Sequence, residues 1–423
     1  MAYREDGIFI IDMTVQLGEM KCRLILGVNE THFESSDYCL QQHDTEVLAM
    51  EIMTHSSGEA ITACLERLSA RVGVPVQIVS DQGSDIKKGI ESFQAHHPEV
   101  VYTHDLSHKI ALFVKPLLEA DEAFQGFNAE CNQAASQVQQ TELNDLKPPI
   151  QRSKARYHHI GSRIQWALNL LSYQDRGDFS AIDPGYCING AALRALMDEF
   201  GSPDWQRLSP LLGKTYPSRT TFDQAVRSAI RDDLFERHHP SLHTFASLGR
   251  QRFDEKFKWV NDYREPLQGW QQLVALIQQA ETQLKHEGLH PLSAHEFQQA
   301  FEGIELTQPA QQLNNDLIGY MNQYAPQASD VPQYSRLVSS DVIESVFGQY
   351  KHLSSTASLQ ELGAMILLLP LLVVNISADL VQQAMENVTH ETLNQWLSDT
   401  FGPSALARRI AAFPPKNKDI IVA

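Results

Sequence analysis

The chain has 423 residues, of which 43% are hydrophobic and 20% charged, and its formal net charge is −18. This composition is that of an ordinary soluble globular protein, and the length predicts two or three domains or one large domain with an insertion. The acidic balance tells against a strong nonspecific DNA binder, because affinity for phosphates comes largely from a basic surface, although a local basic stripe can suffice.

The cysteines and the termini indicate the cellular setting. Five cysteines stand at positions 22, 39, 64, 131 and 187 without Cys-x-x-Cys spacing, which argues against a zinc site or a disulfide framework and fits a reducing cytosol. The N-terminus shows no secretory signal. The most hydrophobic stretch, 365–376, is short and contains Pro370, so we expect a buried core helix, no membrane association and a cytoplasmic protein.

The first 125 residues alternate between strand and helix patterns. Strands are expected at 7–15, 20–28, 46–53, 75–80 and 99–104, and the first two would form an antiparallel hairpin across the Gly18-Glu19 turn. A helix capped by Ser56 or Ser57 should run to Gly73, and another should follow from Asp85 to about residue 95. Parallel pairing of the later strands would use these helices as crossovers.

The rest of the chain has a helical pattern. Residues 106–335 are rich in Gln and punctuated by Leu, and long helices are expected at 339–351 and 358–376. The order β-β-β-α-β-α-β is that of the RNase H-like fold. We therefore expect an α/β protein with an RNase H-like mixed sheet flanked by helices and interrupted by a large all-α insertion. Its parts would be a first core segment (1–125), a helical insertion (126–335), the last core helices (336–380) and a C-terminal helical tail (381–423).

Two acids stand in or after expected strands. Asp12 lies within the first strand among apolar residues, where a carboxylate is costly to bury without a partner or a cation; the alternative is a place on the solvent face. Asp81 ends the fourth strand, which neighbours the first in this fold, so the two carboxylates would face each other and hold Mg²⁺ or Mn²⁺. The alternative for Asp81 is a turn or cap role, for which Asp85 is the better candidate.

Glu344 lies on the helix expected at 339–351, which Ser339 or Ser340 would cap. Its spacing places it on one helix face with Asp341 and Lys351. A lone Glu on a helix is usually a solvated surface residue. The return of the chain to a core-type helix at this point favours a functional role.

These residues resemble the pattern of the DDE transposases, whose RNase H-like core carries Asp on the first strand, Asp after the fourth and Glu on a later helix. By this resemblance Asp12, Asp81 and Glu344 match the catalytic triad. The sequence Asp105-Leu-Ser-His108 resembles the Asp/Cys-x-x-His motif that follows the fifth strand in several cut-and-paste superfamilies. Among these is the hAT type, which has a helical insertion before the Glu.

Two further similarities leave the subfamily open. Glu344 to Lys351 resembles the Glu-x6-Lys half of a Tyr-Arg-Glu-Lys signature in a bacterial insertion-sequence family, but Ser340 stands in the place of the Arg and Leu337 in that of the Tyr. Trp166 sits where hAT-type insertions often carry an Arg/Trp pair near a flipped base. A core tryptophan is the alternative for Trp166.

The resemblance implies Mg²⁺- or Mn²⁺-dependent phosphoryl transfer with two ions, bridged by Asp12 and completed by Asp81 and Glu344. Asp105 and His108 would support the site. Partners would be transposon ends and target DNA, in a homo-oligomer located in the cytoplasm, or at the nucleoid if the protein is bacterial. The candidates for contacts to the DNA backbone are Lys109, Lys115, Lys351, Lys154 and Arg156, and Trp166 is the candidate for a contact to a flipped base.

Two other functions fit the same residues. One is another RNase H-fold nuclease, such as a resolvase or exonuclease. The other is a truncated or domesticated transposase that acts as a DNA-binding or scaffold protein without catalysis. The short stretch before the first expected strand and the net charge of −18 favour the second alternative.

Overall fold

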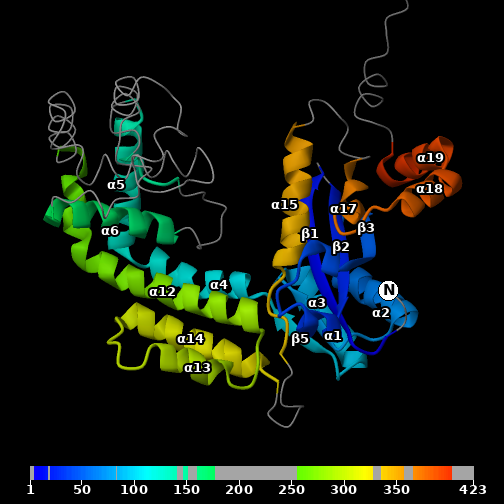
Figure 1. Cartoon of the computed structure of the whole chain (residues 1–423), viewed down its shortest axis with the longest axis horizontal. Coiled ribbons are helices and arrows are strands. Elements are labelled where there is room, and N and C mark those ends of the chain that lie inside the picture. The colour runs from blue at the N-terminus through cyan, green and yellow to red at the C-terminus, as the bar shows by residue number, and fades with distance from the viewer. Residues whose placement is uncertain are drawn as a thin grey trace, which may run out of the picture. The chain divides into compact units, whose positions relative to one another are not determined.

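The computed structural model describes residues 4–17, 20–81, 83–140, 146–150, 160–176, 255–326, 335–356 and 365–402. The chain divides into two compact units (Figure 1). Unit 1 comprises residues 1–109, 281–300 and 320–423, and unit 2 comprises 110–280 and 301–319. The first boundary expected from the sequence, at 125, therefore lies 16 residues beyond the division after residue 109. The chain also returns to unit 1 at residue 281, well before the expected boundary at 335.

Unit 1 contains a five-stranded mixed sheet in the order β3-β2-β1-β4-β5. The strands are β1 (Gly7–Leu17), β2 (Met20–Asn29), β3 (Glu46–Met53), β4 (Gln77–Ser80) and β5 (Val101–His104). β2 pairs antiparallel with β1 and β3, whereas β4 pairs parallel with β1 and β5. Helices α2 (Gly58–Val72) and α3 (Ser84–His96) make the crossovers that parallel pairing requires. The five expected strands, the hairpin and the mixed α/β class are confirmed.

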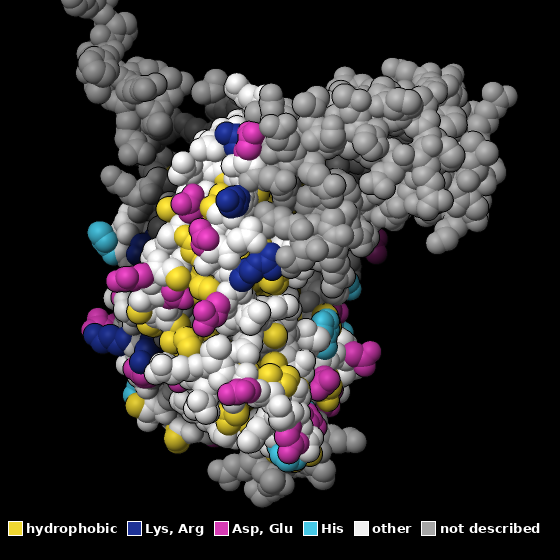
Figure 2. All heavy atoms as spheres, turned by 90° about the vertical axis from the view of Figure 1, so that its left-hand side faces the viewer, with side chains coloured by type: hydrophobic (Ala, Val, Ile, Leu, Met, Phe, Trp, Pro, Cys, Tyr) yellow, Lys and Arg dark blue, Asp and Glu magenta, His cyan; other side chains and the backbone are white. Residues whose placement is uncertain are grey.

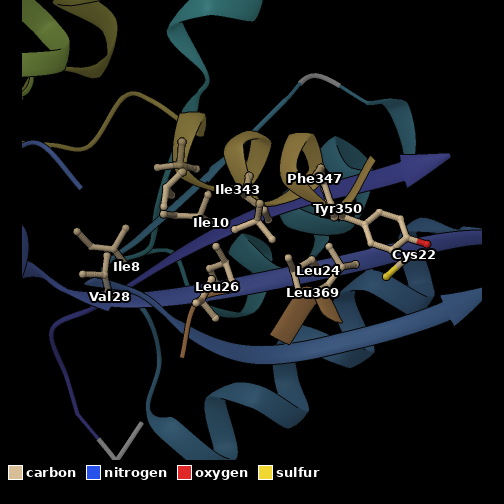
Figure 3. Packing of buried hydrophobic residues seen from close by; sticks show 14 of the residues in the cluster. Ile8, Ile10, Cys22, Leu24, Leu26, Val28, Ile343, Phe347, Tyr350 and Leu369 are labelled. Atoms are coloured by element: carbon tan, nitrogen blue, oxygen red, sulfur yellow. The ribbon is translucent and has the colours of Figure 1, made fainter. Parts of the chain in front are cut away.

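Alternation along β1 divides its side chains between two cores. Phe9 and Ile11 belong to the core that contains the buried residues of α2 and α3. Ile8 and Ile10 belong to the opposite core, where Ile343, Phe347 and Tyr350 of α15 (Asp341–Thr356) pack on the sheet (Figure 3). Each fully buried apolar side chain of this size contributes about 1.5–3 kcal/mol, so α15 is held firmly against this face.

The expected long helix at 358–376 is not observed as such within the described residues. A four-residue helix, α17 (Leu368–Leu371), is present there, and residues 357–364 lie outside the described ranges. Pro370 lacks the N–H that would continue a helical ladder, which accounts for the short helix. Ile366, Leu369 and Val373 are nevertheless buried, so this stretch contributes to the core as expected. Among the described helices, none is long and apolar enough to cross a bilayer.

The remaining elements of unit 1 lie around this core. They are α1 (Glu30–Ser35), η1 (Gln42–Asp44), α13 (Ser293–Ala300), α18 (Ala378–Asn387) and α19 (His390–Phe401). α18 and α19 fall in the tail expected to be helical, whose last residues, 403–423, are outside the described ranges. Trp396 and Phe401 of α19 pack against the core that contains α15.

Every element that the structure describes in unit 2 is helical. These elements are α5 (Glu122–Val138), α6 (Ile160–Arg176), η7 (Lys258–Tyr263) and the larger parts of α4 (Leu106–Glu119), α12 (Arg264–Glu287) and α14 (Gln308–Tyr324). Phe127, Tyr263 and Trp270 form an aromatic cluster in this unit. On the face drawn in Figure 2, the acidic and basic side chains of the described residues are interspersed rather than gathered into one basic patch.

Candidate metal centre

Three carboxylates follow one another across the sheet just beyond the point where the parallel pairing ends. The parallel registers pair Ile11 with Ser80 and Ser80 with His104. The next position along each of these strands holds an acid, which is Asp12, Asp81 or Asp105. Because side chains alternate along β1, Asp12 lies on the same face as Ile8 and Ile10, which is the face that α15 covers.

Asp12 is half-buried, and its environment is strongly acidic. Burial raises the pKa of Asp12 to about 7, with the negative charges of Asp81 and Glu344 acting in the same direction. The N–H of Met13, which donates to Asp12 Oδ1 at 2.6 Å, and the nearby His108 lower this pKa but do not offset the increase. The parallel register of β1 with β4 places Asp12 and Asp81 at neighbouring positions, and α15, which carries Glu344, packs on the same face. The alternative placement of Asp12 on an open solvent face is wrong.

Asp81 is half-buried in the turn between β4 and α3. Its Oδ1 accepts a hydrogen bond from the Gly83 N–H at 3.1 Å, and its main-chain oxygen accepts from Ser80 Oγ at 2.9 Å. Asp81 therefore does fill part of a turn role. The cap role expected for Asp85 is wrong, because Gly83 is at the N-cap of α3 without a side-chain cap and Asp85 lies in the first turn.

Glu344 lies in the first turn of α15, half-buried, with Oε1 3.9 Å from His108 Nδ1. Both serines expected at the start of this helix take part in holding it. The Ser339 hydroxyl accepts from the Asp341 N–H at 3.1 Å, and the Ser340 carbonyl accepts from the Ile343 N–H at 3.1 Å. The expected helix is thus present, and it brings Glu344 to the acids of β1 and β4.

Asp105 is fully buried and joins two distant parts of the chain. Its Oδ1 accepts from the N–H and Nδ1 of His108 at 2.8 and 3.0 Å, and its Oδ2 accepts from the N–H and Oγ of Ser340, both at 2.8 Å. Burial acts to raise the pKa of Asp105, but the hydrogen bonds from His108 and Ser340 outweigh it and hold the pKa well below its usual range. Asp105 is thus an ionised structural acceptor that orients His108 and the start of α15.

The ligand atoms of Asp105, His108 and Glu344 lie within 4.8 Å of one another, a spacing compatible with a metal ion. Carboxylate oxygens are the ligands that Mg²⁺ and Mn²⁺ prefer. Asp12 and Asp105 differ in whether the protein stabilises their negative charge, and this difference indicates which of them would bind a cation. The carboxylate of Asp12 is repelled by its neighbours and would gain from a cation, whereas the four acceptor interactions of Asp105 are already made within the protein.

The basic and aromatic candidates lie in different places. Lys351 is exposed on α15, seven residues after Glu344, and Lys109 is half-buried on α4 next to His108. Lys115 is exposed and pairs with Glu119 at 3.7 Å. Trp166 is buried in unit 2, where its indole N–H donates to the Leu146 carbonyl at 3.0 Å and its ring meets Phe257 edge-on. An indole buried in this way offers no face to a base, so Trp166 has the place of a core residue. Lys154 and Arg156 lie outside the described residues.

Sequence reasoning overlooked Gln77 and the buried contacts of Ser340. Gln77 lies on β4 and is fully buried, with hydrogen bonds to Thr103 and to both main-chain groups of Leu337. The sequence did contain an indication of its role, because Gln77 is a polar residue inside the apolar strand that ends at Asp81. Its partner, 260 residues away, has no signal in the sequence.

A scan against protein-family models gives no match to this chain, and a search of curated proteins gives none either.

Proposed function

We propose that this protein is a DDE-type transposase that cleaves DNA at element ends and transfers the strands in a metal-dependent reaction. The observation that carries the proposal is the placement of Asp12 and Asp81 at neighbouring positions of β1 and β4, with α15, which carries Glu344, packed on the same face of the sheet. Three acids arranged in this way have a plain chemical use in binding divalent cations.

The arrangement of the sheet supports an RNase H-like core. β4 lies directly beside β1 and runs parallel to it, which is the neighbourhood that the fold requires for its first two acids. Unit 2, whose described elements are all helical, interrupts unit 1 at residues 110–280 and 301–319, ahead of Glu344. This position corresponds to the helical insertion expected before the last acid.

Asp12, Asp81 and Glu344 would hold two Mg²⁺ or Mn²⁺ ions, for which carboxylate oxygens are suitable ligands. Bound there, the ions would supply Lewis-acid chemistry for phosphoryl transfer at DNA. The three carboxylates need a fixed geometry more than any covalent chemistry, since phosphoryl transfer relies on position and charge.

Asp105 and His108 provide that fixed geometry. In the network assigned above, His108 Nδ1 donates to Asp105, so Nε2 is the nitrogen that carries the lone pair. The same carboxylate holds the N-terminal end of α15 through Ser340, four residues before Glu344. Lys351 and Lys109 are the candidates for contacts to DNA phosphates, where they would offset the local repulsion by the acids.

The test is nicking of supercoiled plasmid DNA in Mg²⁺ or Mn²⁺ by the full chain and two variants. Asp81→Asn removes one proposed metal ligand, and Asp85→Asn removes a carboxylate from the adjacent first turn of α3 as the matched control. We expect Asp81→Asn to lose cleavage and Asp85→Asn to keep it, with both variants folded by circular dichroism. Cleavage retained by Asp81→Asn contradicts the proposal. DNA binding by the wild-type chain without any cleavage would favour the non-catalytic alternative.

A further inference from the structure

After the described residues resume at Ser335, a short non-helical segment, Ser335–Ser340, precedes α15 and is called the return segment below. It leads directly into α15 and so determines where Glu344 lies. It belongs to none of the five strands, although Arg336 forms an isolated antiparallel bridge with Leu289. Specific contacts must therefore fix its position on the sheet.

Gln77 supplies the central contact. Its Nε2 donates to the Leu337 carbonyl at 2.7 Å, and its Oε1 accepts from the Leu337 N–H at 3.2 Å. One side-chain amide thereby satisfies both main-chain polar groups of a buried residue, as a neighbouring strand would. The Leu106 N–H donates to the Val338 carbonyl at 2.8 Å, so the next residue of the return segment is held as well.

The geometry relates Gln77 directly to the acids. Side chains alternate along β4, so Gln77, Val79 and Asp81 point to the same face of the sheet. Gln77 precedes Asp81 by four residues, and Leu337 precedes Glu344 by seven. The strand that precedes Asp81 thus also holds the segment that precedes Glu344, and the amide of Gln77 is one of the contacts that set the relative position of these two acids.

An apolar side chain at position 77 would suit the surrounding core, which contains Ile8, Val79 and Leu337. A fully buried polar group in such a place specifies one arrangement of its partners, because any other arrangement leaves polar atoms without hydrogen bonds. What Gln77 contributes is therefore the register of the return segment.

We propose that Gln77 is a positioning residue for the metal centre, and that docking of the return segment and binding of divalent cations are coupled through it. The inference rests on the proposed function. Since cations would bind only the docked arrangement tightly, cation binding must in turn stabilise docking. Cations should then slow amide exchange in the return segment, at Leu337 and Ser340.

The test compares wild-type protein with Gln77→Met and Gln283→Met. Gln283 controls for the loss of a buried amide, because it is also a buried glutamine of unit 1, with Nε2 donating to the Ser293 carbonyl at 3.0 Å and to Glu296 Oε2 at 3.3 Å. Removal of groups that orient metal ligands typically weakens metal affinity about 10- to 100-fold. We expect a loss of this size in the Mg²⁺ or Mn²⁺ affinity of Gln77→Met, measured by calorimetry, and no loss in Gln283→Met even where both melting temperatures fall.

A third variant, Thr103→Val, separates the two bonds that Gln77 Nε2 donates. It removes the bond to Thr103 Oγ1, at 2.8 Å, and leaves both bonds to Leu337, so the cation affinity should stay near that of the wild type. The exchange measurement on wild-type protein needs no variant, so it decides the matter even if Gln77→Met does not fold.

The outcomes separate the inference from the proposed function. If cations bind the wild type, and Gln77→Met binds them equally well with the same protection of Leu337 and Ser340, the positioning role is wrong and the metal centre stands. If the wild type binds cations but its Leu337 and Ser340 amides exchange no more slowly when they are bound, the positioning role is likewise wrong and the metal centre stands. If the wild type binds no cation and Asp12→Asn leaves its behaviour unchanged, the proposed function and the inference fail together.

Discussion

Asp12→Asn should stabilise the metal-free protein above neutral pH, because it removes a charge that the fold disfavours. The ordinary pKa of 3.8 and the folded pKa of about 7 differ by about 3. At about 1.4 kcal/mol for each pKa unit, this difference corresponds to about 4 kcal/mol as an upper limit. Because Asp12 is half-buried, we expect solvent screening to reduce the measured gain to about 2 kcal/mol.

The direction in which stability changes with pH follows from the number of protons bound in the folded and unfolded states. Between pH 4 and pH 7 the folded state keeps the Asp12 proton and the unfolded state does not, so the wild type loses stability as the pH rises through this range. Asp12→Asn lacks this loss and retains Oδ1 as the acceptor for the Met13 N–H. The two proteins should therefore be equally stable near pH 4 and diverge up to pH 8.

The assay is urea denaturation from pH 4 to pH 8 in a chelator, repeated at pH 8 with Mg²⁺ or Mn²⁺. Glu30→Gln is the matched control, because burial and the charges of Glu34 and Asp6 also raise the pKa of Glu30 to about 7, at a place outside the cluster. We expect both variants to gain stability at pH 8, but only Asp12→Asn to lose the stabilisation by cations. If Asp12→Asn is no more stable than the wild type at pH 8, the acidic environment of Asp12 is refuted.

Three further predictions concern the support of the site, the core and the DNA surface. Asp105→Asn should lower the free energy of unfolding by about 2–4 kcal/mol, because the amide NH₂ group would face the N–H and O–H donors that now bind the carboxylate. The depressed pKa of Asp105 makes the wild type lose stability as the pH falls below 4, and the variant should lack this loss. Urea denaturation from pH 2 to pH 7 measures both effects. Gly89→Ala should lower the free energy of unfolding by about 1–3 kcal/mol, because the added Cβ would lie 2.6 Å from Ile61 Cβ. Gly319→Ala should raise it by about 0.5–1 kcal/mol, because a Cβ at this position on α14 would meet no atom within 4 Å. Thermal denaturation compares the two variants. Lys351→Ala should lower the salt dependence of DNA binding by about 0.9 in the slope of log K against log salt, and an unchanged slope in fluorescence anisotropy would exclude a phosphate contact.

The local parts of this structure were predictable because the relevant physics is local. Alternating apolar residues determine the strands, and the strand order brought Asp12 and Asp81 to neighbouring positions, as the parallel register of Ile11 with Ser80 bears out. The cap of α2 was also local, since the Ser57 hydroxyl accepts from the Ala60 N–H at 3.2 Å. The cap expected from Asp85 at the start of α3 was wrong, because the N-cap residue is Gly83 and its N–H donates to Asp81.

The contacts that assemble the site could not be predicted, because they join residues far apart in the chain. Ser340 donates to Asp105 across 235 residues, and Gln77 donates to the Leu337 carbonyl across 260. The division into two compact units likewise depends on contacts between distant residues. Helical periodicity shows that α12 and α14 have an apolar face, but it does not show that each helix continues from unit 2 into unit 1.

Asp12 and Asp105 show how one sheet edge can hold two carboxylates for opposite purposes. Asp105 follows the edge strand β5 and accepts four hydrogen bonds, so its charge stabilises the fold and it has little to gain from a cation. Asp12 lies on the inner strand β1, where burial and the charges of Asp81 and Glu344 disfavour its ionised form, so its charge destabilises the fold. Environments that push the pKa values of neighbouring groups apart are typical of functional sites. The stability contributed by Asp105 and Gln77 is therefore what allows the protein to keep a repulsive cluster of acids in place.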